Sequence, residues 1–275
     1  MGESVSSSES PIPLCCLKAF QWAGTPSGTE TTIPSSSTGL TPIDNKAYVT
    51  GTNPKVAIMI IHDVLGWTFA NVRLLADHYA REIDATVYVP DFFAGQVLDH
   101  NLLLQERFAE VPGLDKFMVA NAREVREPEI FACAKALRSN LGYEKVGAVG
   151  FCWGGWGVFR LASKEHRLQG GRKLVDAITC GHPGLLTEAD VEGVDESVAM
   201  QVLAPEHDQW FSDEMKVYAF TTLTQKVKAQ VDFQFFPGVT HGCLVRGDEN
   251  KKGERAAMVR GKNAAVAWMR QWLVT

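Results

Sequence analysis

The fold is decided by the stretch Val146-Gly-Ala-Val-Gly-Phe-Cys-Trp-Gly-Gly155. It begins as a short apolar run, the pattern of a buried parallel strand, and the residues after it, 156–164, have helical character. Between the two elements stands G-x-C-x-G at residues 150–154, the spacing of a nucleophile elbow, with cysteine where serine usually stands. A glycine-rich turn around an inert buried cysteine is the alternative interpretation.

The chemistry of such an elbow explains the spacing of the motif. The nucleophile, here Cys152, occupies a tight strand-to-helix turn, and the glycines on either side leave room for the adjoining strand and helix. The turn places the thiol at a helix N-terminus, where the thiolate is favoured. The next backbone N–H, that of Trp153, would point to where a carbonyl oxygen becomes negative during acyl transfer.

Length and composition indicate one α/β domain, expected over residues 12–275. The 275 residues are 45% hydrophobic and 21% charged, which is enough chain to bury a large core. The net charge of −5 without a long basic run argues against a nucleic-acid partner. No apolar stretch reaches the ~20 residues that span a bilayer, so no membrane association is expected.

The six cysteines indicate a reducing environment. They form neither a C-x-x-C motif nor the spacing of a disulfide framework, so reduced thiols and a cytoplasmic location are expected. Cys180 and His182 lie close in sequence, but two candidate ligands do not make a metal site, and none is predicted. The vicinal pair Cys15-Cys16 is interpreted as packing, with a redox role as the alternative.

The N-terminal part of the chain divides into a tail and an entry region. Residues 1–11 are serine-rich and acidic, which is typical of a disordered polar tail rather than a secretory signal. Residues 12–50 are interpreted as an N-terminal hairpin. Its strands are expected at Leu17–Trp22 and Ala47–Val49, with a polar loop over 31–45 between them.

From residue 56 onward, apolar runs alternate with stretches of helical spacing. This order predicts a mainly parallel central sheet with helices on both faces. Besides the elbow strand, the expected strands are Val56–Ile61, Thr86–Val89, Val175–Thr179, Val198–Leu203 and Val231–Phe236. The expected helices are Ala70–Arg81, helical stretches within Ala120–Leu141, Glu214–Lys228 and Arg255–Leu273. The less regular segment Phe92–Gly113 is expected to cover the site.

Polar residues stand directly after the predicted strands, where the carboxyl ends of a parallel sheet build a site. In α/β-hydrolases the triad runs in the chain order nucleophile, acid, histidine, and Cys152, Asp208 and His241 follow that order. The histidine would move protons, and the acid would hold its tautomer. The competing residues are His62, His182 and His207 for the histidine and Glu206 and Asp213 for the acid.

Five segments distributed over most of the chain carry a family resemblance. They are Trp22–Glu30, Ile61–Gly66, Val89–Phe93, Gly150–Gly155, and His241-Gly242 with Arg246. On these motifs the chain resembles the dienelactone hydrolase family, most closely its fungal members. The resemblance implies an α/β-hydrolase fold without metal or organic cofactor and a Cys-Asp-His triad at Cys152, Asp208 and His241. It also implies an oxyanion hole formed by the backbone N–H groups of Val64 and Trp153.

The family resemblance assigns a candidate role to Asp63. In the family, a carboxylate directly before the residue matched by Val64 lies near the thiol and helps to control its ionisation. Well-known bacterial members carry glutamate there, whereas Asp63 is one methylene shorter. The alternative is that Asp63 caps the following helix or pairs with an arginine.

The resemblance also implies a residue that recognises the substrate. An arginine after the family's histidine binds a substrate carboxylate, and Arg246 is similarly placed. A surface ion pair with Asp248 or Glu249 is the alternative. A second arginine of this kind is not placed, although Arg107 and Arg123 are candidates.

Aromatic residues gather near the predicted strand ends. They are Trp67, Trp153, Trp156, Trp210 and Phe211. Core packing is expected for at least half of them, and any that face the cleft favour a flat or cyclic substrate. Trp67 and Trp210 are the candidates for substrate contact.

The leading hypothesis is a cysteine hydrolase that opens a small-molecule lactone or ester through an acyl-thiol intermediate. One alternative is a biosynthetic enzyme that uses the same triad for lactone formation, isomerisation or thioester release. A non-catalytic binding protein that keeps the pocket is the other. The sequence leaves the oligomeric state open.

Overall fold

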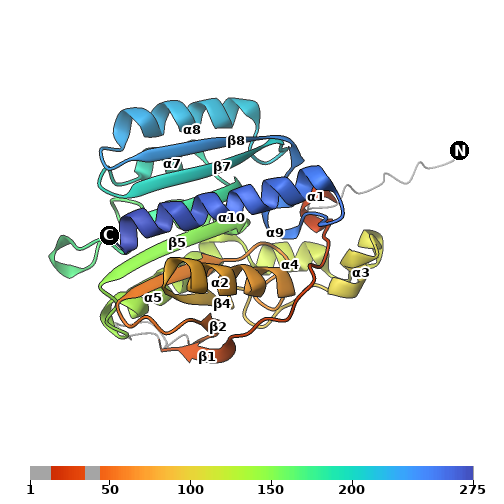
Figure 1. Ribbon diagram of the computed structural model, residues 1–275, viewed down its shortest axis with the longest axis horizontal. Helices are drawn as coiled ribbons and strands as arrows, with labels where there is room; N and C mark the ends of the chain where they lie inside the picture. The colour runs from red at the N-terminus through yellow and green to blue at the C-terminus, as the bar shows by residue number, and fades with distance from the viewer. Residues whose placement is uncertain (1–13, 35–43, 275) are drawn as a thin grey trace, which may run out of the picture.

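The computed structural model describes residues 14–34 and 44–274, and the expected tail at 1–11 lies outside them (Figure 1). Its described strands form one sheet in the order β1-β2-β4-β3-β5-β6-β7-β8. The strands are β1 (Thr29–Ile33), β2 (Asn45–Thr50), β3 (Val56–Ile61), β4 (Thr86–Pro90), β5 (Lys145–Cys152), β6 (Ala177–Pro183), β7 (Ala199–His207) and β8 (Val231–Thr240).

The six strands β3 to β8 are parallel, whereas β1 and β2 form an antiparallel hairpin at one edge. Every residue of β3 is buried. A strand that is apolar throughout is stable only where helices cover both faces of the sheet. Successive side chains of β3 point to opposite faces, and those on each face are buried in a separate apolar cluster. Met59 and Ile61 pack into one apolar cluster, and Ile58 and Ile60 pack into another.

The helices cover both faces as the sequence predicts. Helices α2 (Ala70–Ile83) and α10 (Lys252–Leu273) bury their apolar sides on the face of Ile58. Helices α5 (Arg123–Ser139) and α6 (Gly154–Leu161) pack on the face of Met59, together with α8 (Asp213–Lys226). Smaller elements are α1 (Leu14–Leu17), α3 (His100–Leu104), α4 (Leu114–Ala120), α7 (Glu188–Gly193), α9 (Cys243–Arg246) and two 3-10 turns, Phe108–Glu110 and Gln169–Gly171.

The structure contains the predicted N-terminal hairpin, but the predicted position of its first strand is wrong. The segment expected as strand Leu17–Trp22 begins at the end of helix α1 and continues without regular structure. Its backbone hydrogen bonds leave the sheet, since the N–H of Phe20 donates to the carbonyl of Arg246. The strand that pairs with β2 is β1, within and just before the expected polar loop, where β-branched threonines favour an extended chain.

Two further features complete the comparison with the sequence. Helix α5 continues through Pro128, which is exposed, so the proline neither starts nor ends the helix. Strands β6, β7 and β8 extend several residues beyond their predicted ends, up to Pro183, His207 and Thr240. In the described part of the chain, no helix combines the length and the apolar character needed to cross a membrane.

Candidate active site

The elbow has the tight geometry that its sequence predicts. Strand β5 ends at Cys152, whose φ is +50°, a left-handed conformation that strains a residue with a side chain. A Cβ atom on Gly154 would lie 2.1 Å from the carbonyl oxygen of Ile61, and one on Gly150 would lie 2.4 Å from that of Gly154. Both glycines are therefore required by backbone contacts, as expected for a strained strand-to-helix turn.

The carboxyl ends of β7 and β8 bring Asp208 and His241 together. His241 follows β8 directly, and its Nδ1 is 2.9 Å from each carboxylate oxygen of Asp208, which follows β7. Neither side chain has exposed surface. Asp208 Oδ1 also accepts the backbone N–H groups of Trp210, at 2.9 Å, and Phe211, at 3.0 Å. These bonds fix the carboxylate, so that Nδ1 of the histidine carries a proton and Nε2 is left for chemistry.

The competing acids point elsewhere. Glu206 accepts the backbone N–H of Gly238 at 2.6 Å, and Asp213 pairs with Lys216 at 2.9 Å. Asp208 is therefore the carboxylate on the imidazole of His241.

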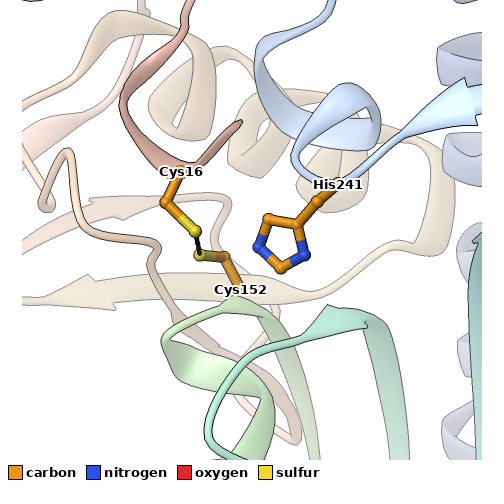
Figure 2. A group of neighbouring side chains, drawn as sticks. All are labelled: Cys16, Cys152 and His241. Atoms are coloured by element: carbon orange, nitrogen blue, oxygen red, sulfur yellow. Dashed lines mark hydrogen bonds between the residues drawn. The ribbon is translucent and has the colours of Figure 1, made fainter. Parts of the chain in front are cut away.

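Cys152 lies beside the same imidazole, beneath the N-terminal helix α1 (Figure 2). The Sγ atoms of Cys16 and Cys152 and a ring nitrogen of His241 all lie within 4.8 Å of one another. The Nε2 atom of His241 has no hydrogen-bond partner among the described residues. Cys152 is only 2% exposed, and the sulfur of Cys16 on α1 is one of the atoms that lie against its thiol.

The charges around the site favour a thiolate–imidazolium pair. Burial opposes the thiolate of Cys152, but hydrogen bonding with Cys16 and the positive charges of His241 and Arg246 lower the pKa of the thiol well below its ordinary value. Burial likewise opposes the charged form of His241, but the thiolate and Asp208 raise the pKa of the imidazole to about 10. A thiol with a lowered pKa is the form of cysteine that is most reactive near neutral pH.

Asp63 and Arg246 form a buried ion pair next to the thiol. Arg246 Nη1 is 2.5 Å from Asp63 Oδ2, while Arg246 Nη2 is 4.0 Å from Cys152 Sγ. Gly242, at φ +86°, leads into helix α9, and a Cβ atom there would lie 2.4 Å from the guanidinium. Burial raises the pKa of Asp63, and the charge of Arg246 opposes that rise. Of the interpretations of Asp63, pairing with an arginine is observed.

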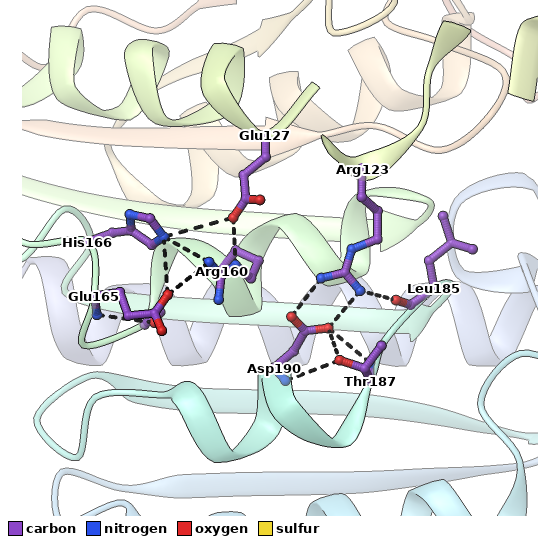
Figure 3. A network of polar contacts seen from close by, with 9 residues as sticks. Arg123, Glu127, Arg160, Glu165, His166, Leu185, Thr187 and Asp190 are labelled. Carbon is purple, nitrogen blue, oxygen red and sulfur yellow. Dashed lines mark hydrogen bonds and ion pairs between the residues drawn. The ribbon is translucent and has the colours of Figure 1, made fainter. Parts of the chain in front are cut away.

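The surface ion pair considered for Arg246 is wrong, because the residue is 2% exposed. The other candidate arginines are engaged away from the thiol. Arg107 pairs with Glu110 through its Nε at 2.7 Å. Arg123 binds both carboxylate oxygens of Asp190, at 2.7 and 2.8 Å (Figure 3).

Two groups of polar contacts tie helix α5 to the helices beside it. Arg160 of α6 donates to Glu127 of α5 at 2.6 Å, and Arg123 of α5 reaches the carboxylate of Asp190 on α7 (Figure 3). The guanidinium of Arg123 stacks on the ring of Trp156, with its central carbon 5.0 Å from the ring centre. These contacts join α5, α6 and α7, and α6 begins two residues after Cys152.

The aromatic candidates divide between core and site. Trp67 lies in the apolar cluster with α2, where the guanidinium of Arg73 stacks on its ring, so the structure does not bring it to the thiol. Trp210 does approach, because its indole Nε1 is 3.0 Å from Cys16 Sγ. Trp153, Trp156 and Phe211 are buried, which agrees with the expectation that at least half are core residues.

Two residues near the site were not selected from the sequence. His182 lies in β6 at φ +37°, and its ring centre is 5.0 Å from that of His241. Burial and the charge of His241 lower the pKa of His182 well below its ordinary value. The position of His182 after a predicted strand could have indicated that it lies near the elbow. Cys16 is half of the vicinal pair that the sequence analysis interprets as packing, with a redox role as the alternative, but its contact with Cys152 was not predicted.

The segment Phe92–Gly113 was expected to cover the site, but helix α1 also lies against Cys152. Segment Phe92–Gly113 does border the loop after β3, since His100 Nε2 is 2.7 Å from the carbonyl oxygen of Leu65. Val64 and Trp153, the candidate oxyanion donors, follow Asp63 and Cys152 directly and are buried.

Two curated proteins resemble the chain over most of its length. The hydrolase tropI of Talaromyces stipitatus is 26% identical over 276 residues, and the match covers 96% of this chain and 97% of that protein. A carboxymethylenebutenolidase homolog of Mus musculus is 27% identical, with 83% of this chain and 88% of that protein covered.

Solved structures share the fold. The dienelactone hydrolase of Anabaena variabilis superimposes with a TM-score of 0.62 at 12% identity, covering 91% of this chain and all of that one. The model of the dienelactone hydrolase family matches residues 45–273, which contain the elbow, the acid and the histidine. The chain is therefore an ester-bond hydrolase that belongs to the dienelactone hydrolase family.

Proposed function

We propose that this hydrolase opens a lactone or simple ester through an acyl-thiol intermediate on Cys152, with His241 and Asp208 completing the triad. The observation that carries the proposal is the meeting of three strand ends. Cys152 closes β5 at a strained turn, and His241, held by Asp208, lies beside its sulfur. The pKa of the thiol is lowered and that of the adjacent imidazole is raised, which favours the thiolate that attacks in acyl transfer to sulfur.

In the acylation step, the thiolate attacks the carbonyl carbon of the substrate. Negative charge develops on the carbonyl oxygen, where the backbone N–H groups of Trp153 and Val64 are the proposed donors. As the tetrahedral intermediate collapses, the carbon–oxygen bond of the ester breaks, and His241 gives its proton to the leaving oxygen. With a lactone substrate, the leaving alcohol stays attached to the acyl group.

In the deacylation step, water takes the place of the thiol. The now neutral His241 accepts a proton from water, the resulting hydroxide attacks the thioester, and Cys152 leaves as a thiolate. Asp208 keeps Nδ1 of the histidine protonated in both steps and stabilises the imidazolium. The sum is the addition of one water molecule to one ester bond.

Arg246 supports the thiolate in this proposal. Its guanidinium is shared between Asp63, at 2.5 Å, and the Cys152 sulfur, at 4.0 Å. Binding of a substrate carboxylate by Arg246, which the family resemblance implies, stays a prediction. It would require the guanidinium to accept a second anion next to Asp63.

The test is turnover by Cys152→Ala on a panel of lactones and activated esters. Cys133→Ala is the matched control, because Cys133 is equally buried but lies in helix α5. We expect the first variant to lose turnover and the control to keep it. Wild-type activity in Cys152→Ala would contradict the proposed nucleophile. Assaying the reverse reaction on hydroxy acids and hydroxy thioesters distinguishes lactone formation or thioester release from hydrolysis.

A further inference from the structure

A second cysteine lies directly against Cys152. Cys16 belongs to the single turn of α1, and its sulfur points toward that of Cys152 (Figure 2). The two Sγ atoms are 3.9 Å apart, although the residues are 136 positions apart in sequence. Both residues are 2% exposed. The covering helix therefore brings a thiol to the proposed nucleophile itself.

Contacts on both sides hold Cys16 in this position. The indole Nε1 of Trp210 donates to Cys16 Sγ at 3.0 Å. The chain that leaves α1 is tied down by the hydrogen bond from the Phe20 N–H to the Arg246 carbonyl, at 3.1 Å. Because Trp210 also donates its backbone N–H to Asp208, the placement of Cys16 is connected to the triad loop.

The other cysteines with described side chains are in a different state. Burial raises the pKa of the thiols of Cys133, Cys180 and Cys243, the last to about 12. Only a thiolate reacts quickly with a peroxide, so these three thiols are protected. Cys152 has the lowered pKa of a reactive thiol, together with a neighbouring sulfur in contact.

We propose that Cys16 is a resolving cysteine, which captures an oxidised Cys152 in a disulfide and so switches the hydrolase off reversibly. The oxidant is a peroxide. The Cys152 thiolate attacks one peroxide oxygen, the O–O bond breaks, and the sulfur loses two electrons to become a sulfenic acid. The other oxygen leaves as hydroxide or alkoxide and takes a proton from the imidazolium of His241.

The second step joins the two cysteines. The sulfur of Cys16 attacks the sulfenic sulfur, the S–S bond forms and the S–O bond breaks. The hydroxyl group leaves with the thiol proton as water. The sulfurs must approach from 3.9 Å to a bond length of about 2.05 Å. A movement of this size is within reach of side-chain rotation and a small shift of α1, which is a single turn.

The disulfide would have two consequences. It removes the thiolate that attacks the substrate, and it ties α1 over the site that a substrate must enter. It also removes the sulfenic acid before further oxidation to the irreversible sulfinic acid. A thiol reductant then restores both cysteines, so the covering helix protects the nucleophile as well as closing the site.

The experiment treats the full-length protein with hydrogen peroxide in a buffer that contains a metal chelator. We expect wild-type protein to lose esterase activity, to become about 2 Da lighter and to yield a Cys16–Cys152 cross-linked peptide on non-reducing digestion. Dithiothreitol should restore the activity. Each protein is compared with its own untreated sample, so that an effect of a substitution on turnover does not enter the comparison.

The variant Cys16→Ser should lose activity in peroxide without recovering it, because Cys152 proceeds to a sulfinic acid that is about 32 Da heavier. Cys16→Ala should do the same, which excludes an effect of the serine hydroxyl. Cys15→Ser is the matched control and should behave as wild type. Absence of the cross-linked peptide in wild type, or full recovery of Cys16→Ser, would overturn the proposal.

The cross-link itself does not depend on the catalytic assignment, but the loss of activity rests on the proposed nucleophile. A cross-linked protein that still turns over would overturn the switch. The nucleophile is judged separately, by turnover of untreated Cys152→Ala.

Discussion

Removing the charge of Arg246 is the sharpest test of how the thiolate is stabilised. The guanidinium Nη2 lies 4.0 Å from Cys152 Sγ. At an effective dielectric constant of about 20, two unit charges at this distance interact with about 4 kcal/mol. This corresponds to a pKa shift of about 3 units as an upper bound, because Asp63 already takes part of the charge of Arg246. Arg246→Gln should therefore raise the pKa of the Cys152 thiol.

The same argument predicts how the pKa of the Cys152 thiol changes when Asp63 loses its charge. Asp63→Asn leaves the guanidinium uncompensated beside the sulfur, so the pKa of the thiol should fall below that of wild type. A double variant that carries both substitutions removes the pair and should lie between the two. At neutral pH, Arg246→Gln should consequently contain less thiolate than wild type, whereas Asp63→Asn should contain more.

The assay is the rate of alkylation of Cys152 by iodoacetamide as a function of pH, followed by peptide mass spectrometry without substrate. The midpoint of each profile reports the apparent pKa of the thiol. Arg255→Gln, at an exposed position of α10, changes the net charge by the same amount and should leave the midpoint in place. An unchanged midpoint in Arg246→Gln would refute the electrostatic argument, and a raised one in Asp63→Asn would refute the role of the pair.

Three further outcomes are expected. His241→Ala should lower kcat by about 10²- to 10⁴-fold. Asp208→Asn should lower kcat by less, because the acid holds the imidazole but moves no proton. Equal losses of kcat in the two variants would contradict this assignment of roles. Glu206→Gln should leave kcat within a few fold of wild type, since its partner is the Gly238 N–H. Gly154→Ala should cost about 1–3 kcal/mol in the free energy of urea unfolding, because its Cβ would meet a carbonyl oxygen at 2.1 Å. Gly253→Ala, with open space around its Cβ, should be no less stable than wild type.

The elbow, and the strand ends that carry Cys152, Asp208 and His241, could be predicted because their constraints are local. The steric demand at positions 150 and 154 admits only glycine, so the motif is visible in ten residues of sequence. Asp208 and His241 each follow an apolar run, and parallel strands bring their carboxyl ends to one edge. These two regularities, together with the family resemblance, identified the residues that the fold assembles.

The surroundings of the thiol could not be predicted, because they depend on contacts between distant segments. The apolar residues from Leu17 to Trp22 have the pattern of a strand, yet their partners are Asn71 and the carbonyl of Arg246. The pairing of Asp63 with Arg246 spans 183 positions and depends on the direction of a four-residue helix. Neither contact leaves a periodic signal, so helix α1 and the contact of Cys16 with Cys152 were not predicted.

The neighbouring sequence also does not show whether an aromatic residue in a loop faces the core or the site. Trp67 and Trp210 both follow predicted strands, but Trp67 turns into the cluster beside α2, whereas Trp210 reaches Cys16. The difference arises from the path of each loop after its strand.

The most direct measurement of the central claim is the covalent state of the enzyme during turnover. A lactone or activated ester is mixed with the protein, and the reaction is quenched with acid before the steady state decays. Intact-mass analysis and peptide mapping then locate the acyl group. The account predicts one acyl group per chain, attached to the peptide that contains Cys152. Turnover without a covalent adduct, or with the acyl group on another residue, would contradict it.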